Sequence, residues 1–157
     1  MTPLKLTFIQ SFNSMRTFLS MYYDKTHSNK IGVMAGSLNL WKKTQNWKLK
    51  PQTFDPRAWD EWLTCVHNTL QDLNIQENPE QFLYNEESAF LCMQNYFKYF
   101  YDQTSWQDVG NLVELLKQAK YVETDPIWQE WQQAIQHVLN NSYELDIYFD
   151  PFTGNRM

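Results

Sequence analysis

The chain has 157 residues, a formal charge of −5 and an aromatic content of 17%. A chain this long buries about two-thirds of its unfolded surface, so a single domain, 1–157, needs no disulfide or metal to hold it. Cys65 and Cys92 are too few for a disulfide framework or a four-ligand zinc site. The aromatic content excludes a disordered chain. The acidic net charge disfavours nucleic acid as the main partner. No apolar run is long enough to span a membrane. With no signal-peptide pattern at the start, the chain is expected in the cytoplasm.

The sequence repeats itself in two ordered blocks, which we sought first because a repeat determines how the whole fold is interpreted. One shift along the chain aligns Phe12 with Phe90, Met15 with Met93, Tyr23 with Tyr101, Thr26 with Thr104, and Gly32 with Gly110. Shorter shifts, which differ by one residue, align Asp55-Pro56 with Asp125-Pro126 and Trp59-Asp60-Glu61-Trp62 with Trp128-Gln129-Glu130-Trp131. We therefore predict two repeat units, 7–73 and 85–141, with a linker 74–84 between them and a tail 142–157.

Each unit is predicted to contain three helices. The first has apolar residues three and four apart, which form one stripe on a helix, and Thr7 or Asn85 stands before it as an N-cap. The third begins at Asp-Pro, where Asp caps the helix and Pro takes its first position. The predicted fold is all-α: two tandem three-helix repeats packed around a shared aromatic core.

Both ends of the chain have some strand character. The segment LKLTFI near the start is expected to lead into the first helix, and LDIYF in the tail resembles a short strand. A pairing of these two segments as strands is left open.

The recurring glycines and tryptophans each have two interpretations. Gly32 and Gly110 lie inside a helical pattern, where Gly is unfavourable, so either a ligand approaches the backbone or a Trp or Tyr packs against it. The Trp pairs either stack on sugars or bases, or fill the core. We favour packing for the glycines and core for the tryptophans, because their helical spacing recurs in both units.

The sequence offers no catalytic or metal-binding set, so we expect neither an enzyme nor a cofactor. His27, His67 and His137 do not align across the repeat, and both cysteines are expected to be buried and inert. The carboxylate pairs Asp60-Glu61 and Glu86-Glu87 are expected on first helical turns, where the helix dipole favours acids. The recurring Tyr-Asp-x-Thr is expected to close a helix end, and Glu61 and Glu130 to contact the neighbouring unit or a helix end.

Charge is divided unequally between the halves. Residues 1–78 hold nine Lys and Arg against six Asp and Glu, a charge of +3, whereas residues 79–157 hold four against twelve, a charge of −8. An acidic surface carrying aromatic side chains suits a basic protein partner and steers its approach. The candidate partner-binding residues are Asp102, Trp106, Asp108, Glu114, Tyr121, Glu123, Glu144, Asp146, Tyr148 and Asp150.

Residues 7–140 resemble the small bacterial immunity proteins that accompany contact-dependent and other polymorphic toxins. The resemblance rests on the string F-x-x-M-x-x-F-L-x-x-Y-Y-x-x-T from Phe12 to Thr26, on Ile31-Gly32, and on D-P-x-x-W-x-E-W from Asp55 to Trp62, with partial copies in the second unit. These are framework residues, which report the fold more than the activity. The basic loop Trp41–Pro51 departs from the compact second unit, so the two units need not present equivalent surfaces.

The resemblance implies an inhibitor that binds the C-terminal domain of its cognate toxin and covers the active site or substrate cleft. Many such toxins are nucleases with basic clefts, which an acidic protein can occupy. The rival interpretation is a helical scaffold that binds a peptide or helix between its repeats, with the 41–51 loop as the contact. An enzyme with an unrecognised site is a third and weaker alternative.

Overall fold

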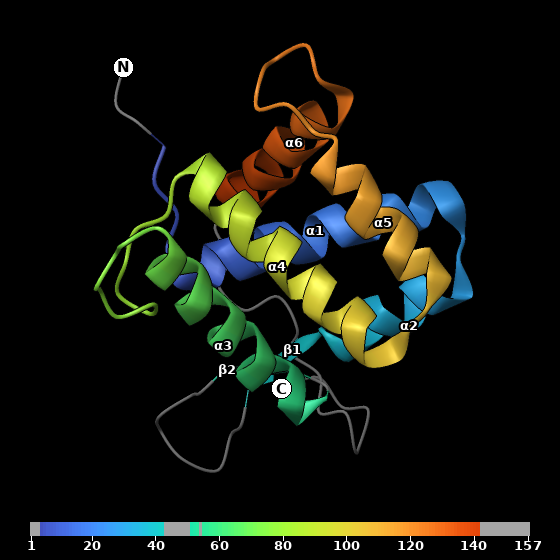
Figure 1. The fold of residues 1–157 in the computed structure, drawn as a ribbon, viewed down its shortest axis with the longest axis horizontal. Coiled ribbons are helices and arrows are strands. Elements are labelled where there is room, and N and C mark those ends of the chain that lie inside the picture. Colours follow the sequence, from blue (N-terminus) through green and yellow to red (C-terminus); the bar gives the residue numbers. More distant parts are fainter. Residues whose placement is uncertain (1–3, 43–50, 54, 142–157) are drawn as a thin grey trace.

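A computed structural model describes residues 4–42, 51–53 and 55–141, and within them the fold is all-α (Figure 1). These described residues form six helices and one short antiparallel pair of strands, in the order α1 (Phe8–Thr26), α2 (Asn29–Ser37), β1 (Leu40–Lys42), β2 (Pro51–Thr53), α3 (Pro56–Asp72), α4 (Glu86–Thr104), α5 (Gln107–Lys117) and α6 (Pro126–Asn141). Each predicted repeat unit therefore contains three helices, at the places where the apolar spacing predicts them.

The first helices of the two halves begin and end in the same way. α1 and α4 each have 19 residues and start with a reciprocal capping box, at Thr7 and at Asn85. Both end at a residue in the left-handed conformation, His27 with φ 52° and Ser105 with φ 57°. The caps predicted from the sequence are confirmed.

The Tyr-Asp-x-Thr motif closes these two helices, as predicted, through its threonine. The Thr26 hydroxyl donates to the Tyr22 carbonyl and the Thr104 hydroxyl donates to the Phe100 carbonyl, each at 3.0 Å. Each threonine oxygen also accepts from the backbone N–H two residues further on. The recurring motif thus helps to end a helix and begin the next turn.

The third helices begin at Asp-Pro, also as predicted. Asp55 accepts from the backbone N–H of Arg57 at 3.1 Å, and Asp125 accepts from Ile127 and Trp128 at 2.8 and 3.0 Å. Backbone hydrogen bonds from Lys120 and Trp128 lower the pKa of Asp125, because they stabilise the ionised carboxylate.

The aromatic core joins the two halves. α3 packs on α4 and α6 packs on α1, so each third helix contacts the first helix of the other half (Figure 1). Trp62 on α3 lies 5.6 Å, between ring centroids, from both Phe12 and Tyr96. Trp131 on α6 lies 5.8 Å from Phe90 and 6.2 Å from Phe18. Trp62, Trp128 and Trp131 are buried, as expected of core residues, and Trp59 is partly buried and packed against the core.

Gly32 and Gly110 lie beneath tyrosines. A Cβ atom on Gly32 would stand 2.9 Å from the Tyr23 ring, and one on Gly110 would stand 2.6 Å from the Tyr101 ring. No real Cβ packs so closely, so both glycines permit a helix-to-helix contact. This confirms close packing as the reason for the recurring glycines.

Two expected helix positions differ in the structure. The helix does not include the start of LKLTFI, because Leu6 exchanges two backbone hydrogen bonds with Tyr84, of 2.7 and 2.8 Å, and α1 begins only at Phe8. The tail segment LDIYF lies outside the described residues. Asp60 and Glu61 are not on the first turn, because α3 begins at Pro56. The strands β1 and β2, which pair Leu40 with Thr53, were not predicted.

Several contacts pair matching positions of the two halves. Leu6 and Tyr84, which align in the sequence, bond to each other, and two side-chain contacts cross between α2 and α5: Ser28 with Asp108, and Lys30 with Trp106. In the sequence alignment Ser28 matches Trp106, and Lys30 matches Asp108. Exchanging the two halves therefore turns one contact into the other, which is the arrangement expected around a two-fold axis. The duplication itself stays an interpretation of the sequence.

The glycines provide a matched test of packing. Gly110→Ala is expected to lower the free energy of unfolding by about 1–3 kcal/mol, because the new methyl group overlaps the Tyr101 ring. Gly36→Ala, in α2, is expected to raise it by about 0.5–1 kcal/mol, because nothing lies within 4 Å of its Cβ position and Ala favours the helix. Urea unfolding of both variants measures the difference. If Gly110→Ala leaves the free energy of unfolding unchanged, the contact with Tyr101 does not require glycine.

Candidate partner-binding site

The candidate metal ligands and the two thiols are the first groups to place among the described residues. No three His, Cys, Asp or Glu side chains in this part of the chain lie together in a way that could hold a metal ion. Cys65 and Cys92 are buried free thiols, and burial raises the pKa of Cys65 to about 11 and that of Cys92 to about 12. Both thiols therefore keep their protons near neutral pH, which makes them poor nucleophiles.

The structure places Asp102 and Glu114 in a small hollow of about 170 Å³ between α4 and α5. Each has a lysine beside it: Lys98 Nζ lies 3.5 Å from the Asp102 carboxylate, and Lys117 Nζ lies 3.1 Å from that of Glu114. The local charge is therefore nearly balanced. All four side chains are exposed, so the pairs contribute little to stability.

Trp106 and Asp108 face α2. The Asp108 carboxylate accepts from the hydroxyl of Ser28, the N-cap residue of α2, and Lys30 Nζ lies 4.5 Å from the centre of the Trp106 ring. Asp108 also helps to raise the pKa of Tyr22, although burial is the larger cause. Both predicted residues thus help to hold the start of α5 against α2.

Tyr121 and Glu123 lie together, on the loop between α5 and α6, beside the start of α4. They line a hollow of about 630 Å³, which we call the Tyr121 hollow: Leu4, Asn85, Glu86, Glu87, Tyr121, Val122, Glu123, Thr124, Trp128 and Gln132. Among these lining residues are three carboxylates and no Lys, Arg or His. This is where the structure combines predicted acidic and aromatic residues without a neutralising lysine.

Aromatic packing holds Tyr121 in place. Its ring stacks on Trp128 at 4.7 Å and 20°, and it meets Phe90 edge-on at 5.3 Å. The residues Tyr121 and Val122 nevertheless remain 36% and 49% exposed. Burial, and then the charge of Glu87, raise the pKa of Tyr121, so its hydroxyl keeps its proton. The result is a rigid, partly exposed aromatic side chain among acids, which is typical of a protein-binding surface.

Sequence reasoning missed Glu86, Glu87 and Val122 as members of this site. The two acids were assigned to the dipole of the helix that they begin, and they do lie on the first turn of α4. That role leaves their charge available to a partner, and only the fold shows that the α5–α6 loop stands beside them. Glu144, Asp146, Tyr148 and Asp150 lie outside the described residues.

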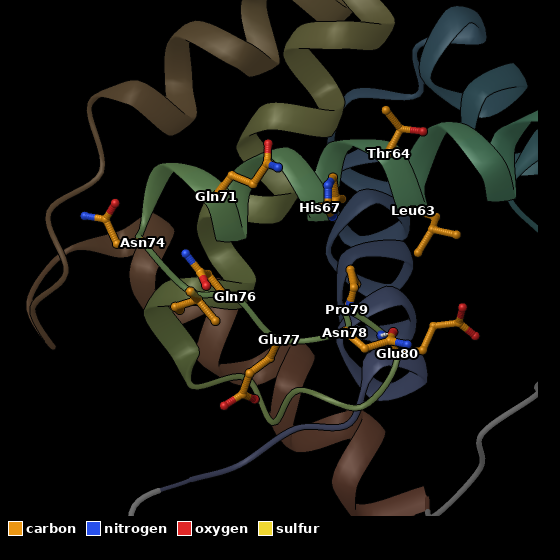
Figure 2. Close-up of a pocket in the computed structure, with 11 residues that line it drawn as sticks. Leu63, Thr64, His67, Gln71, Asn74, Gln76, Glu77, Asn78, Pro79 and Glu80 are labelled. Carbon is orange, nitrogen blue, oxygen red and sulfur yellow. Dashed lines mark hydrogen bonds between the residues drawn. The ribbon is translucent and has the colours of Figure 1, made fainter.

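A larger hollow, of about 950 Å³, contains none of the predicted residues. Figure 2 shows residues that line it: Leu63, Thr64, His67 and Gln71 on α3, and the segment from Asn74 to Glu80 that follows this helix. Its lining combines amides, one histidine, two carboxylates and a few apolar groups, and it has no set of groups for a particular reaction.

Comparisons with family models, with curated proteins and with solved structures give no match to this chain. Within the described residues, no helix combines the length and the apolar character needed to cross a membrane.

The buried thiols give a simple test of the absence of cysteine chemistry. At pH 8 neither Cys65 nor Cys92 is expected to react with a thiol-labelling reagent in the native protein, because both pKa values lie well above 8 and both groups are buried. Both should react after unfolding in guanidinium chloride, which is the control. Rapid labelling of one thiol in the native state would identify an accessible thiolate that this structure does not contain.

Proposed function

We propose that this protein is an immunity protein, which binds the catalytic domain of a cognate toxin and covers its active site or substrate cleft. It acts in the cytoplasm and catalyses no reaction of its own. The observation that carries the proposal is the Tyr121 hollow, where Glu86, Glu87 and Glu123 surround an exposed aromatic ring without a basic residue in the lining. The resemblance of residues 7–140 to bacterial immunity proteins supports the same function.

The partner that fits this surface is a basic protein domain. Three carboxylates attract Lys and Arg side chains and accelerate encounter, and the rigid Tyr121 ring offers contact area that loses little conformational freedom on binding. A nuclease has a positively charged cleft that receives phosphate, so a carboxylate-rich surface can occupy the same cleft. We therefore propose a nuclease as the toxin class.

Charge reversal on the Tyr121 hollow tests the proposal. The binding partner for the test is the C-terminal domain of a large secreted protein, in catalytically inactive form, where the gene immediately upstream encodes such a protein. The double variant Glu87→Lys/Glu123→Lys is expected to raise its Kd at least tenfold, or about 1.4 kcal/mol, because two attractive charges become repulsive. Wild-type affinity should also fall as salt concentration rises. Calorimetry and a toxin-activity assay measure both effects.

A matched control carries the same charge change elsewhere. Asp72→Lys/Glu77→Lys reverses two exposed acids near the end of α3 and in the linker, and it should bind within about twofold of wild type because long-range charge effects are screened. Thermal unfolding checks that all variants fold. If both double variants lose affinity equally, net charge rather than this hollow determines binding. If the upstream domain is neither bound nor inhibited, the immunity function is wrong and the scaffold interpretation takes precedence.

A further inference from the structure

The two third helices carry the same glutamate in the same motif, Trp-x-Glu-Trp, and the structure gives it a different environment in each half. On α6, Glu130 forms an ion pair with Lys25 Nζ of α1. The side chain of Glu130 is only 22% exposed, so this pair is shielded from solvent on the carboxylate side. A contact of this glutamate with the neighbouring unit or with a helix end is expected from the sequence, and the ion pair with Lys25 is a contact with the neighbouring unit.

On α3, the matching Glu61 faces α4, and no lysine of the described residues forms an ion pair with it. Gln103 stands on α4 where Lys25 stands on α1, because the alignment that matches Tyr23 with Tyr101 also matches these two positions. The Tyr99 hydroxyl, one turn earlier on α4, interacts with Glu61, and this interaction is the main cause of the raised pKa of Tyr99. Glu61 therefore also contacts the other unit, but no ammonium group of the described residues is paired with it.

A hollow of about 670 Å³ lies at this place, between the end of α2, the start of α3 and the end of α4. We call it the Glu61 hollow, and its lining is Val33, Ser37, Asp55, Arg57, Asp60, Glu61, Tyr99, Phe100, Gln103, Thr104 and Trp106. Three carboxylates and one guanidinium are among these residues. Arg57 Nε lies 3.6 Å from the Asp55 carboxylate, so the guanidinium is placed against the N-cap of α3 and the lining keeps an excess of negative charge.

The walls of the Glu61 hollow are suited to the stem of a long cationic side chain. Tyr99, Phe100 and Trp106 supply aromatic surface, with the Phe100 and Trp106 rings edge to face at 5.7 Å. Trp106 already attracts an ammonium group, because Lys30 Nζ lies 4.5 Å from its ring centre. Apolar walls that lead to a carboxylate match the chemistry of a lysine, whose methylene chain packs against apolar surface while its charged end is paired.

We propose that the Glu61 hollow receives a lysine side chain of a partner protein, as Glu130 receives Lys25 of the chain itself. Both halves have the glutamate, but only Glu130 has a lysine of the described residues beside it. Beside Glu61, a hollow with aromatic walls lies where the matching position is Gln103. The inference rests on the proposed function only in taking the partner to be a basic protein. The hollow is separate from the Tyr121 hollow, with which it shares no lining residue.

A small probe tests the site on the whole protein. The probe is Nα-acetyl-lysine N-methylamide, and the matched neutral probe is Nα-acetyl-norleucine N-methylamide, which has the apolar stem without the charge. The expected result is a saturable shift of the Trp106 indole N–H signal in a 15N-resolved NMR spectrum, at millimolar concentrations of the lysine probe. That signal is assigned with Trp106→Phe. An equal response to the norleucine probe, or no saturable response to the lysine probe, would overturn the proposal.

Substitutions within the hollow complete the test. Gln103→Lys restores the internal lysine, and it is expected to abolish probe binding and raise Tm by about 2 °C through a new pair with Glu61. Glu61→Gln keeps a hydrogen-bonding group for Tyr99 and should weaken probe binding at least tenfold, and in that background Gln103→Lys should no longer raise Tm. Glu123→Gln, in the Tyr121 hollow, is the control that should bind the probe like wild type.

The two proposals fail in different ways. If Glu61→Gln or Gln103→Lys binds the lysine probe as tightly as wild type, the Glu61 hollow is not the lysine site, whatever the toxin domain does. If the probe binds as expected but the upstream toxin domain does not bind the protein, the lysine site stands and the immunity function is wrong.

Discussion

The structure depends on two buried tryptophans that each bridge both halves of the chain. Trp62 packs between Phe12 of its own half and Tyr96 of the other, and Trp131 packs between Phe90 and Phe18 in the corresponding way. In both halves the third helix packs on the first helix of the other half. Each half therefore buries part of the other, so a change of a core residue in one half affects the packing of both. Exposed positions on either side of this core are free of that constraint, and there the halves differ in charge.

Local chemistry explains why much of the fold could be predicted. Capping residues, Asp-Pro pairs and apolar spacing act on neighbours within a few residues. The start of a helix can therefore be predicted directly from its N-cap residue, which is Thr7, Asn85, Asp55 or Asp125 in four of these helices. The exchange of third helices between halves has no such signal, since an apolar stripe shows that a helix is covered but not what covers it. The Leu6–Tyr84 pairing was missed for a related reason: it is made by backbone groups, which every residue carries.

The candidate site was only partly predictable because a charged residue can serve the fold, a partner, or both. Counting acids in the second half could not show that Asp108 holds α2, or that Asp102 and Glu114 stand beside lysines. It also could not bring Glu87 next to Tyr121, since these residues are far apart in sequence and meet only where the α5–α6 loop returns to the start of α4. The sequence therefore predicted the acidic character of the second half, whereas the fold determined which acids lack a basic neighbour.

A difference between matching positions carries more information than either position alone. Glu130 and Glu61 occupy the same motif on helices that pack in the same way, so the ion pair with Lys25 shows which group this framework accommodates beside the acid. Where Gln103 replaces the lysine, the carboxylate keeps a tyrosine hydroxyl and the surrounding space stays open. A lysine at position 103 would pair with Glu61 inside the chain, as Lys25 pairs with Glu130. With glutamine there, the proposed partner's lysine would supply that charge, and it would bind to walls that are already in place.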